Sequence, residues 1–181
     1  IHLLKRAKWL AMNGQPPKAA TPALQFFLEN DIRKKHFLSN SRALDAFALL
    51  DDYDIYTSLK LWMNHPDKIL SHLSRALVNR RLFRIEMQNE PFSQEKINAV
   101  RALTKKKYKL TEEETGYFVF FEKTSNYTYH PGTDNINILF KDGTVKDITE
   151  VSDQLNISLL SKPTIKYFLC YPKNIEIPAT D

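Results

Sequence analysis

The hydrophobic pattern of this 181-residue chain changes period once, just after Asn79. Before that point apolar side chains recur every three or four residues, which is the spacing of amphipathic helices. Beyond it, alternating and aromatic runs predominate, as in strands, and an Asp-Gly pair at 142–143 signals a hairpin. We therefore predict an α+β fold in which short helices come first and a small, mainly antiparallel α+β unit follows. The predicted domains are 1–90 and 91–181.

Turn and capping signals bound the predicted elements. Thr21 followed by Pro22 is typical of a helix start, and Asp54 is predicted to cap the helix over 55–63. Phe47 and Trp62 are predicted to be core residues where short helices meet. We predict helices over 1–11, 23–28, 44–50, 55–63, 69–78, 93–107 and 149–160, and strands over 82–87, 117–122, 136–140, 145–148 and 164–171.

Composition excludes several classes of protein. An aromatic content of 12% supplies enough core material to exclude a wholly disordered chain. The four glycines are not spaced as a Walker loop or a dinucleotide-binding G-x-G-x-x-G motif. The densest apolar run, at 117–121, is far shorter than the roughly 20 residues that span a bilayer.

A single cysteine, Cys170, excludes an intrachain disulfide and a thiolate metal cluster. It lies in an apolar run, so a buried, inert thiol is favoured over a reactive one. Because no signal peptide is evident, we expect a reducing, cytoplasmic compartment. The chain opens on Ile1 rather than methionine, and we expect it to be part of a longer protein.

Histidines and carboxylates give no recognisable metal-binding spacing. None of the five histidines pairs with another at i+4, the spacing of a helical zinc site. His65 and Asp67 flank a proline, which favours a turn at a helix start over a pair of metal ligands. Asp51, Asp52 and Asp54 are interpreted as helix-capping carboxylates, and we predict no metal ligand or catalytic residue in this stretch.

Positive charge is concentrated in the middle of the chain. Residues 60–109 hold twelve basic and four acidic residues, a net of +8, whereas the whole chain carries +5. Such a segment suits a polyanion, and the planar guanidinium of arginine suits phosphate in particular. A solvated charged surface is the alternative. The candidate phosphate-binding residues surround the predicted helix-to-strand corner at Asn79: Arg75, Arg80, Arg81 and Arg84.

Two further functions fit the same pattern. A non-catalytic nucleic-acid-binding module would use the basic segment together with exposed aromatic residues on strands. A purely structural oligomerisation module would instead bury those aromatic residues. The aromatic candidates are Tyr117, Phe118, Tyr127 and Tyr129.

One specific stretch of the sequence is Asn-Arg-Arg-Leu-Phe-Arg at 79–84. Further informative stretches are 44–55, 61–67, 140–143, 153–158 and 161–172. Together these stretches resemble the C-terminal half of bacterial HD-domain metal-dependent phosphohydrolases. The branch is the one related to deoxynucleoside triphosphate (dNTP) triphosphohydrolases and to the sterile-alpha-motif-and-HD-domain dNTPase.

The resemblance implies that the parent enzyme hydrolyses nucleotide phosphates, either dNTPs or dGTP, with a divalent metal and as a homo-oligomer. The family's metal ligands include an adjacent His-Asp pair, which this sequence lacks, so the resemblance places them upstream. The helices would then be the tail of an all-α HD bundle. By the same resemblance Arg80 and Arg84 match positions that contact nucleotide phosphates, and Arg81 and Arg75 match less closely. This stretch would supply phosphate-binding residues and oligomer contacts.

Overall fold

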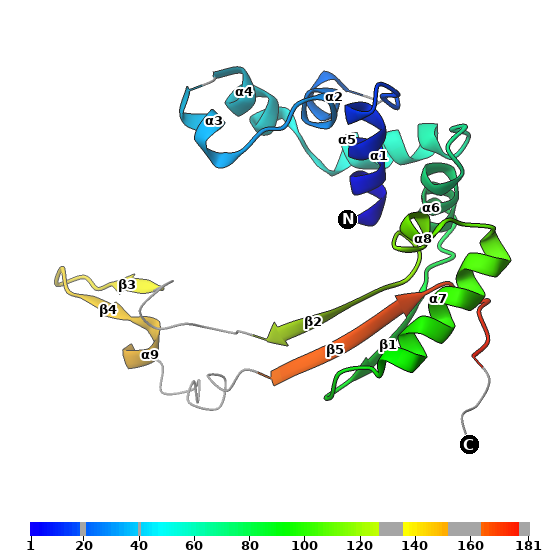
Figure 1. The fold of residues 1–181 in the computed structure, drawn as a ribbon. Coiled ribbons are helices and arrows are strands. Elements are labelled where there is room, and N and C mark those ends of the chain that lie inside the picture. Colours follow the sequence, from blue (N-terminus) through cyan, green and yellow to red (C-terminus); the bar gives the residue numbers. More distant parts are fainter. Residues whose placement is uncertain (19–20, 40, 127–135, 152–163, 178–181) are drawn as a thin grey trace. The chain divides into compact units, whose positions relative to one another are not determined.

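The computed structural model describes residues 1–18, 21–39, 41–126, 136–151 and 164–177. Helices and small sheets together confirm the predicted α+β fold (Figure 1). The chain forms two compact units that interleave along the sequence. The first comprises Ile1–Arg84, Ala99–Phe120 and Tyr171–Asp181, and the second Ile85–Asn98 and Phe121–Cys170. Residue 90, where the sequence placed the domain boundary, therefore lies within the second unit.

Short helices dominate the first unit. The helices predicted over the first 80 residues are all present, and the structure adds α3, a helix that the sequence did not predict. None of the residues of α3 is buried, so it lacks the apolar stripe that would have indicated it. The helices are α1 (His2–Met12), α2 (Pro22–Glu29), α3 (Lys34–Ser39), α4 (Ser41–Leu49), α5 (Asp52–Trp62), α6 (Lys68–Val78) and α8 (Glu112–Thr115).

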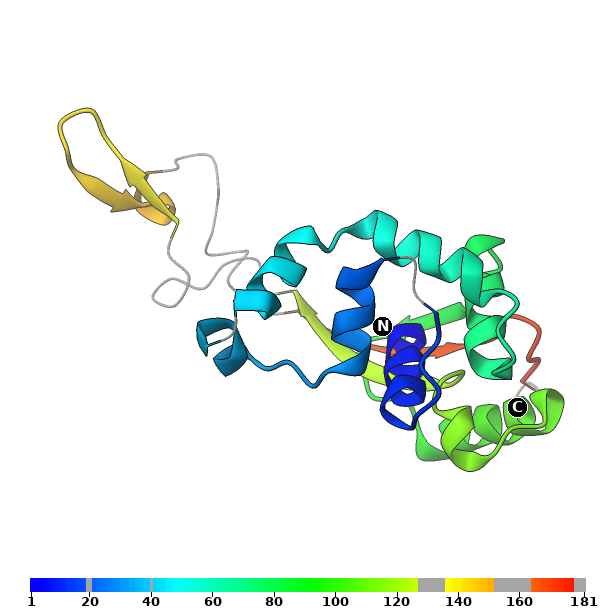
Figure 2. The same cartoon turned by 90° about the horizontal axis from the view of Figure 1, so that it is seen from above.

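The core of this unit lies where α1 packs against α2 and α6, and α6 against α5 (Figure 2). Trp62 is 1% exposed, which confirms it as a core residue. The prediction for Phe47 is wrong, because its side chain is 59% exposed. Only Ala43 of α4 is buried, and Phe47 instead makes an edge contact with the ring of Phe37 on α3, with centroids 5.6 Å apart.

Helix starts follow the capping signals, with one correction. Thr21 caps α2 through its side chain, and Pro22 occupies the first helical turn as predicted. Asp54 does not cap α5. The cap is Asp51, whose carboxylate accepts the Asp54 N–H at 3.2 Å, while Asp54 accepts the Asp51 N–H at 2.7 Å. The two aspartates are three residues apart, so they form a reciprocal capping box.

The described strands lie mainly in the second unit. A three-stranded sheet has the order β1-β5-β2, and Figure 1 shows β2 and β5 running in opposite directions. The predicted hairpin is confirmed, with Leu139 opposite Val145 in an antiparallel pair. Part of the predicted helix over 149–160 lies outside the described residues. The elements are β1 (Arg84–Gln88), β2 (Phe120–Asn126), β3 (Asn137–Leu139), β4 (Val145–Asp147), α9 (Ile148–Val151) and β5 (Thr164–Tyr171).

Strand β2 starts later than the sequence predicted. The Tyr117 N–H donates to the Glu114 carbonyl at 3.1 Å and the Phe118 N–H to the Thr115 carbonyl at 2.9 Å. These bonds continue the turn of α8, so the strand begins at Phe120 rather than at Tyr117.

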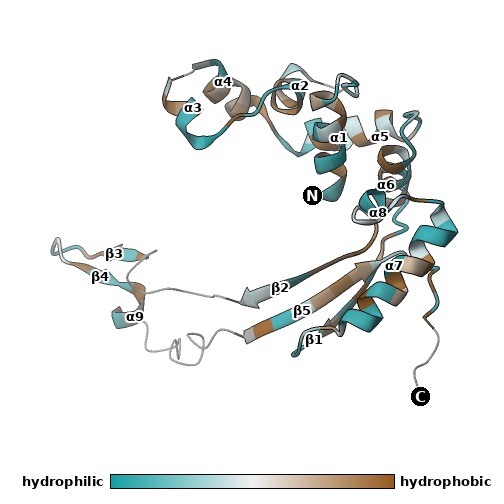
Figure 3. Cartoon of the chain, viewed as in Figure 1, coloured by the Kyte–Doolittle hydropathy of each residue, from teal (hydrophilic) through white to brown (hydrophobic). Residues whose placement is uncertain are grey.

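Helix α7 (Gln94–Tyr108) joins the second unit to the first along the sequence. It begins after Ser93, as predicted, and the Ser93 hydroxyl accepts the Lys96 N–H. Hydrophilic residues occupy most of its length (Figure 3). Within the described residues, no helix has both the length and the hydropathy needed to cross a bilayer.

Candidate functional site

A pocket of 650 Å³ lies at the C-terminal end of α6, entirely within the first unit. We call it the α6 pocket. Three separate segments line it: the last turns of α6 with the turn that follows, the end of α7, and residues 172–174. Its basic lining residues are Arg75, Arg80, Arg81 and Lys173, its ring-bearing ones are His72, Phe83 and Tyr108, and its amides are Asn79 and Asn174.

Three of the four arginines predicted from the sequence meet in this pocket. Arg75 belongs to α6, and Arg80 and Arg81 belong to the turn after it. Arg84 does not line the pocket. It begins β1, and its guanidinium lies over the ring of Tyr171, 5.9 Å from the centroid.

The backbone of Arg80 adopts a left-handed conformation, with φ of 56°. The Arg80 N–H donates to the Leu77 carbonyl at 3.1 Å, and the Arg81 N–H to the Ala76 carbonyl at 2.7 Å. This is the Schellman pattern, in which glycine normally occupies the left-handed position. An arginine there costs about 1–2 kcal/mol in backbone conformation. Such a cost, borne at a pocket, points to a use for the side chain.

Electrostatically the pocket is open to an anion. Among the described residues, neither the Arg80 nor the Arg81 guanidinium has a side-chain partner, and no carboxylate lines the pocket. Arg75 donates one bond from Nε to the Met63 carbonyl at 2.6 Å, which leaves its terminal nitrogens available. Unpaired guanidinium groups are well suited to bind phosphate oxygens in pairs.

The inner wall of the pocket holds a neutral histidine. His72 packs against Tyr108, with ring centroids 5.1 Å apart, and against Phe118, with centroids 5.2 Å apart. Burial lowers the pKa of His72, and the nearby Arg75 charge lowers it further. His72 is therefore uncharged at neutral pH and can act as a hydrogen-bonding group rather than as a further cation.

Sequence reasoning missed His72, Tyr108, Lys173 and Asn174 as members of the site. The Tyr108 hydroxyl donates to Asn174 Oδ1 at 2.9 Å, which joins the end of α7 to the segment after β5. These positions are up to 102 residues apart in the chain. No local motif marks any of them. The one signal nearby is the run of lysines at 105–107, which precedes Tyr108 in the sequence.

The described residues do not fit a metal centre. Within them, no three histidine, cysteine, aspartate or glutamate side chains come together as ligands. His65 and Asp67 form the predicted turn, in which the Asp67 N–H donates to His65 Nδ1 at 3.0 Å. Asp51 and Asp54 are both engaged in the capping box.

The aromatic residues proposed as an exposed nucleic-acid platform are only partly described. Phe118 is 2% exposed, as the alternative of buried aromatic residues expects, and Tyr117 is half-buried with the Arg6 guanidinium 5.4 Å from its ring centroid. Tyr127 and Tyr129 lie outside the described residues. Cys170 is 5% exposed, and burial raises the pKa of its thiol, so the predicted buried thiol is confirmed.

The comparisons with known proteins differ in their outcome. No protein-family model and no curated protein matches the chain. Among solved structures, the chain is similar to a phosphohydrolase from Bacteroides thetaiotaomicron, with 46% sequence identity and a TM-score of 0.75. The match covers 94% of this chain and 42% of that phosphohydrolase. The chain thus spans less than half the length of the enzyme that it resembles in both sequence and fold.

Proposed function

We propose that this chain forms part of a metal-dependent phosphohydrolase of the HD type that acts on deoxynucleoside triphosphates. In this proposal the α6 pocket binds the nucleotide phosphates through Arg75, Arg80 and Arg81. The similarity to a phosphohydrolase at 46% identity supports the reaction class. The observation that carries the phosphate site is Arg80, an arginine with φ of 56° whose side chain lines a pocket with no carboxylate among its described lining residues.

The pocket can bind and orient a phosphate group. Two guanidinium groups, which have no side-chain partner among the described residues, offer paired N–H donors, and a charge-assisted bond to phosphate contributes about 1.5–3 kcal/mol. Lys173 adds a flexible ammonium group at the same pocket. The rings of Tyr108 and Phe83 supply flat apolar surface against which a planar base can pack.

No hydrolytic step is assigned to the described residues. A divalent metal, where bound, would activate water for attack on phosphorus. Because the described residues offer no cluster of three metal-ligating side chains, we place that chemistry elsewhere in the enzyme. Homo-oligomer formation and a cytoplasmic location stay predictions, and light scattering of the purified protein tests the first.

Nucleotide binding measured by calorimetry tests the phosphate site. Arg80→Ala and Arg81→Ala should each weaken dNTP binding by about 10- to 100-fold, because each removes a charge-assisted bond. Arg80→Lys should restore binding only in part, since lysine keeps the charge but not the planar pair of donors. Arg84→Ala should have a smaller effect, because its guanidinium lies over Tyr171 and does not line the pocket.

A matched control is Arg33→Ala, which removes an exposed arginine paired with Asp31 and away from the pocket. It should leave binding unchanged. If Arg80→Ala and Arg81→Ala bind dNTP as tightly as this control, the assignment of the α6 pocket to phosphate is wrong. Thermal unfolding of each variant separates loss of binding from loss of folding.

A further inference from the structure

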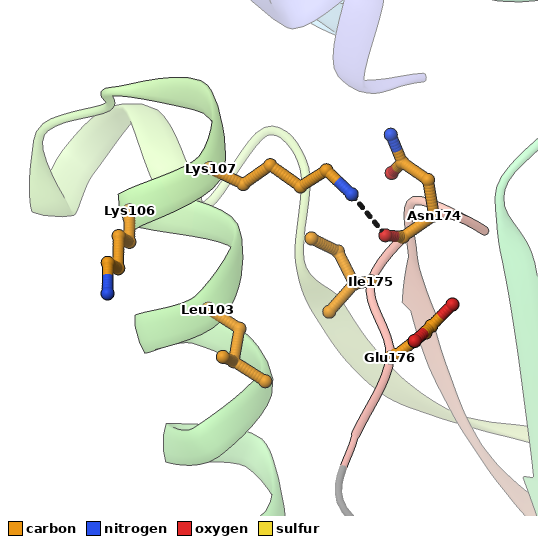
Figure 4. A pocket seen from close by; sticks show the side chains of 6 residues that line it. All are labelled: Leu103, Lys106, Lys107, Asn174, Ile175 and Glu176. Carbon is orange, nitrogen blue, oxygen red and sulfur yellow. Dashed lines mark hydrogen bonds between the residues drawn. The ribbon is translucent and has the colours of Figure 1, made fainter.

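A second pocket of 540 Å³ adjoins the α6 pocket within the first unit (Figure 4). We call it the α7 pocket. It lies between the C-terminal half of α7 and the segment that follows β5, and Asn174 lines both pockets. Each pocket alone falls in the range of about 300–1,000 Å³ that accommodates one small ligand. Its lining residues are Leu103, Lys106, Lys107, Asn174, Ile175 and Glu176.

Asn174 is held from both sides by consecutive residues of α7. Lys107 donates from Nζ to the Asn174 backbone carbonyl, and the Tyr108 hydroxyl donates to Asn174 Oδ1. Lys107 lines one pocket and Tyr108 the other. One fixed asparagine therefore forms the boundary between the two pockets, and its neighbour Lys173 brings a cation to that boundary.

Positive charge continues across this boundary. From the α6 pocket it passes from Arg80 and Arg81 to Lys173, and then to Lys107 in the α7 pocket. The Lys107 ammonium has three N–H donors and gives one to Asn174, so it retains donors for an anion. Figure 4 shows Lys107 reaching toward Asn174, whereas Lys106 points away from it.

The α7 pocket differs from the α6 pocket in one respect. The described residues of its lining include no aromatic ring, so they offer no surface for stacking a base. An oligonucleotide would need such a surface for each successive base, whereas a phosphate chain needs only cations and amides. Among the described lining residues of both pockets, Glu176 is the one carboxylate, and Figure 4 shows it directed away from α7.

We propose that the α6 and α7 pockets together bind a linear phosphate chain longer than a triphosphate, with the chain crossing Asn174. This inference rests on the proposed function, since the first phosphates would occupy the α6 pocket. The chain can be inorganic polyphosphate or a nucleoside with four or more phosphates, because the chemistry recognised past Asn174 is the phosphate alone.

Binding by the full-length protein is to be measured for dNTP, inorganic triphosphate, adenosine tetraphosphate and a long linear polyphosphate. Lys107→Gln should weaken binding of the longer chains and leave triphosphate binding unchanged. For the longer chains, the slope of log affinity against log salt concentration should fall by the equivalent of about one phosphate contact. Glu176→Gln should strengthen binding of the longer chains only, because it removes the one opposing charge. Lys105→Ala is the control, since Lys105 pairs with Glu112 and lines neither pocket.

Adenosine tetraphosphate distinguishes the source of the chain. Two affinity ratios are compared: adenosine tetraphosphate over dNTP, and long polyphosphate over inorganic triphosphate. If the two ratios are equal, the site accepts a phosphate chain carried by a nucleoside. A gain confined to long polyphosphate supports the inorganic chain.

The inference is overturned if chain length brings no gain, or if neither Lys107→Gln nor Glu176→Gln changes the ratio of long-chain to triphosphate binding. The proposed function survives that result so long as dNTP binding still depends on Arg80. If the natural protein does not bind dNTP at all, the proposed function is refuted instead. Binding of oligothymidylate that depends on Lys107 would overturn the inference in favour of a nucleic acid.

Discussion

The two ends of helix α6 use charged residues in opposite ways. At its N-terminal end, the Asp67 carboxylate accepts the Leu70 N–H at 2.8 Å and two bonds from the Arg6 guanidinium, at 3.2 and 2.6 Å. The side chains of this pair are only 9% and 12% exposed. At its C-terminal end, Arg80 and Arg81 are exposed and line a pocket.

The contrast separates a structural arginine from a binding one. Burial lowers the pKa of Arg6, but the hydrogen bonds and charge of Asp67 outweigh this and raise it overall. Arg6 is thus committed to its partner. The arginines at the other end keep their donors for a ligand, and Arg80 retains a costly backbone conformation as well. Commitment to a carboxylate, rather than residue type, decides which arginine can bind phosphate.

Asp67→Ala should have the largest effect on folding. It removes the helix cap and leaves the Arg6 charge buried without its carboxylate partner, and breaking such a pair costs about 3–5 kcal/mol in the free energy of unfolding. Urea denaturation measures the loss. The exposed pair formed by Asp31 and Arg33 is the control, and Asp31→Ala should cost less than about 1 kcal/mol. Equal losses in the two variants would remove the contrast between the ends of α6.

Asp67→Asn should isolate the contribution of the Asp67 charge to the free energy of unfolding, since asparagine can still cap the helix. Burial raises the pKa of Asp67, but the hydrogen bonds from Arg6 and from the Leu70 N–H lower that pKa by a larger amount, so the net shift is downward. The stabilisation is therefore present above the ordinary aspartate pKa of about 4 and is lost as pH falls through the lower native value. At neutral pH the variant should lose about 1.5–3 kcal/mol. A difference from the natural protein that persists at the lowest pH would contradict this account.

Arg80→Gly should uncouple stability from binding at the other end of the helix. Glycine adopts the left-handed conformation without steric cost, which stabilises the folded state. Its greater freedom in the unfolded chain offsets part of this gain, so we expect a net stabilisation of about 0.5–1 kcal/mol. The same variant should bind dNTP as weakly as Arg80→Ala does. Paired denaturation and calorimetry measure both effects, and an arginine needed only for folding would lose stability instead.

His72 should report on the ligand without any mutation. Its pKa is lowered in the folded protein, so its contribution to stability is present above about pH 6.5 and declines as pH falls. A phosphate anion bound at Arg75 would offset the repulsion from that cation and raise the His72 pKa. An NMR titration of the imidazole with and without dNTP measures the shift. No shift on saturation with dNTP would place the phosphates elsewhere.

Local signals in the sequence were enough to place most elements. Thr21 with Pro22, and the Asp-Gly pair at 142–143, act on backbone groups within a few residues, so their effect does not depend on distant packing. The Asp51–Asp54 capping box shows the limit of such reasoning. Either aspartate could serve as the cap, and the helix register decided which one did.

Burial and the composition of the site required the tertiary structure. Phe47 and Trp62 occupy similar apolar stripes on their helices, yet Phe47 is exposed and Trp62 is buried. The neighbouring helices determine which stripe is covered, and their positions cannot be read from the local sequence pattern.

The concentration of basic residues around Asn79 could be seen in the amino-acid sequence, since charge is a property of composition. That Arg75, Arg80 and Arg81 share a pocket with Tyr108 and Asn174, while Arg84 lies over Tyr171, could be seen in the folded chain alone. This convergence depends on packing between segments distant in the chain and on one left-handed residue at the end of α6.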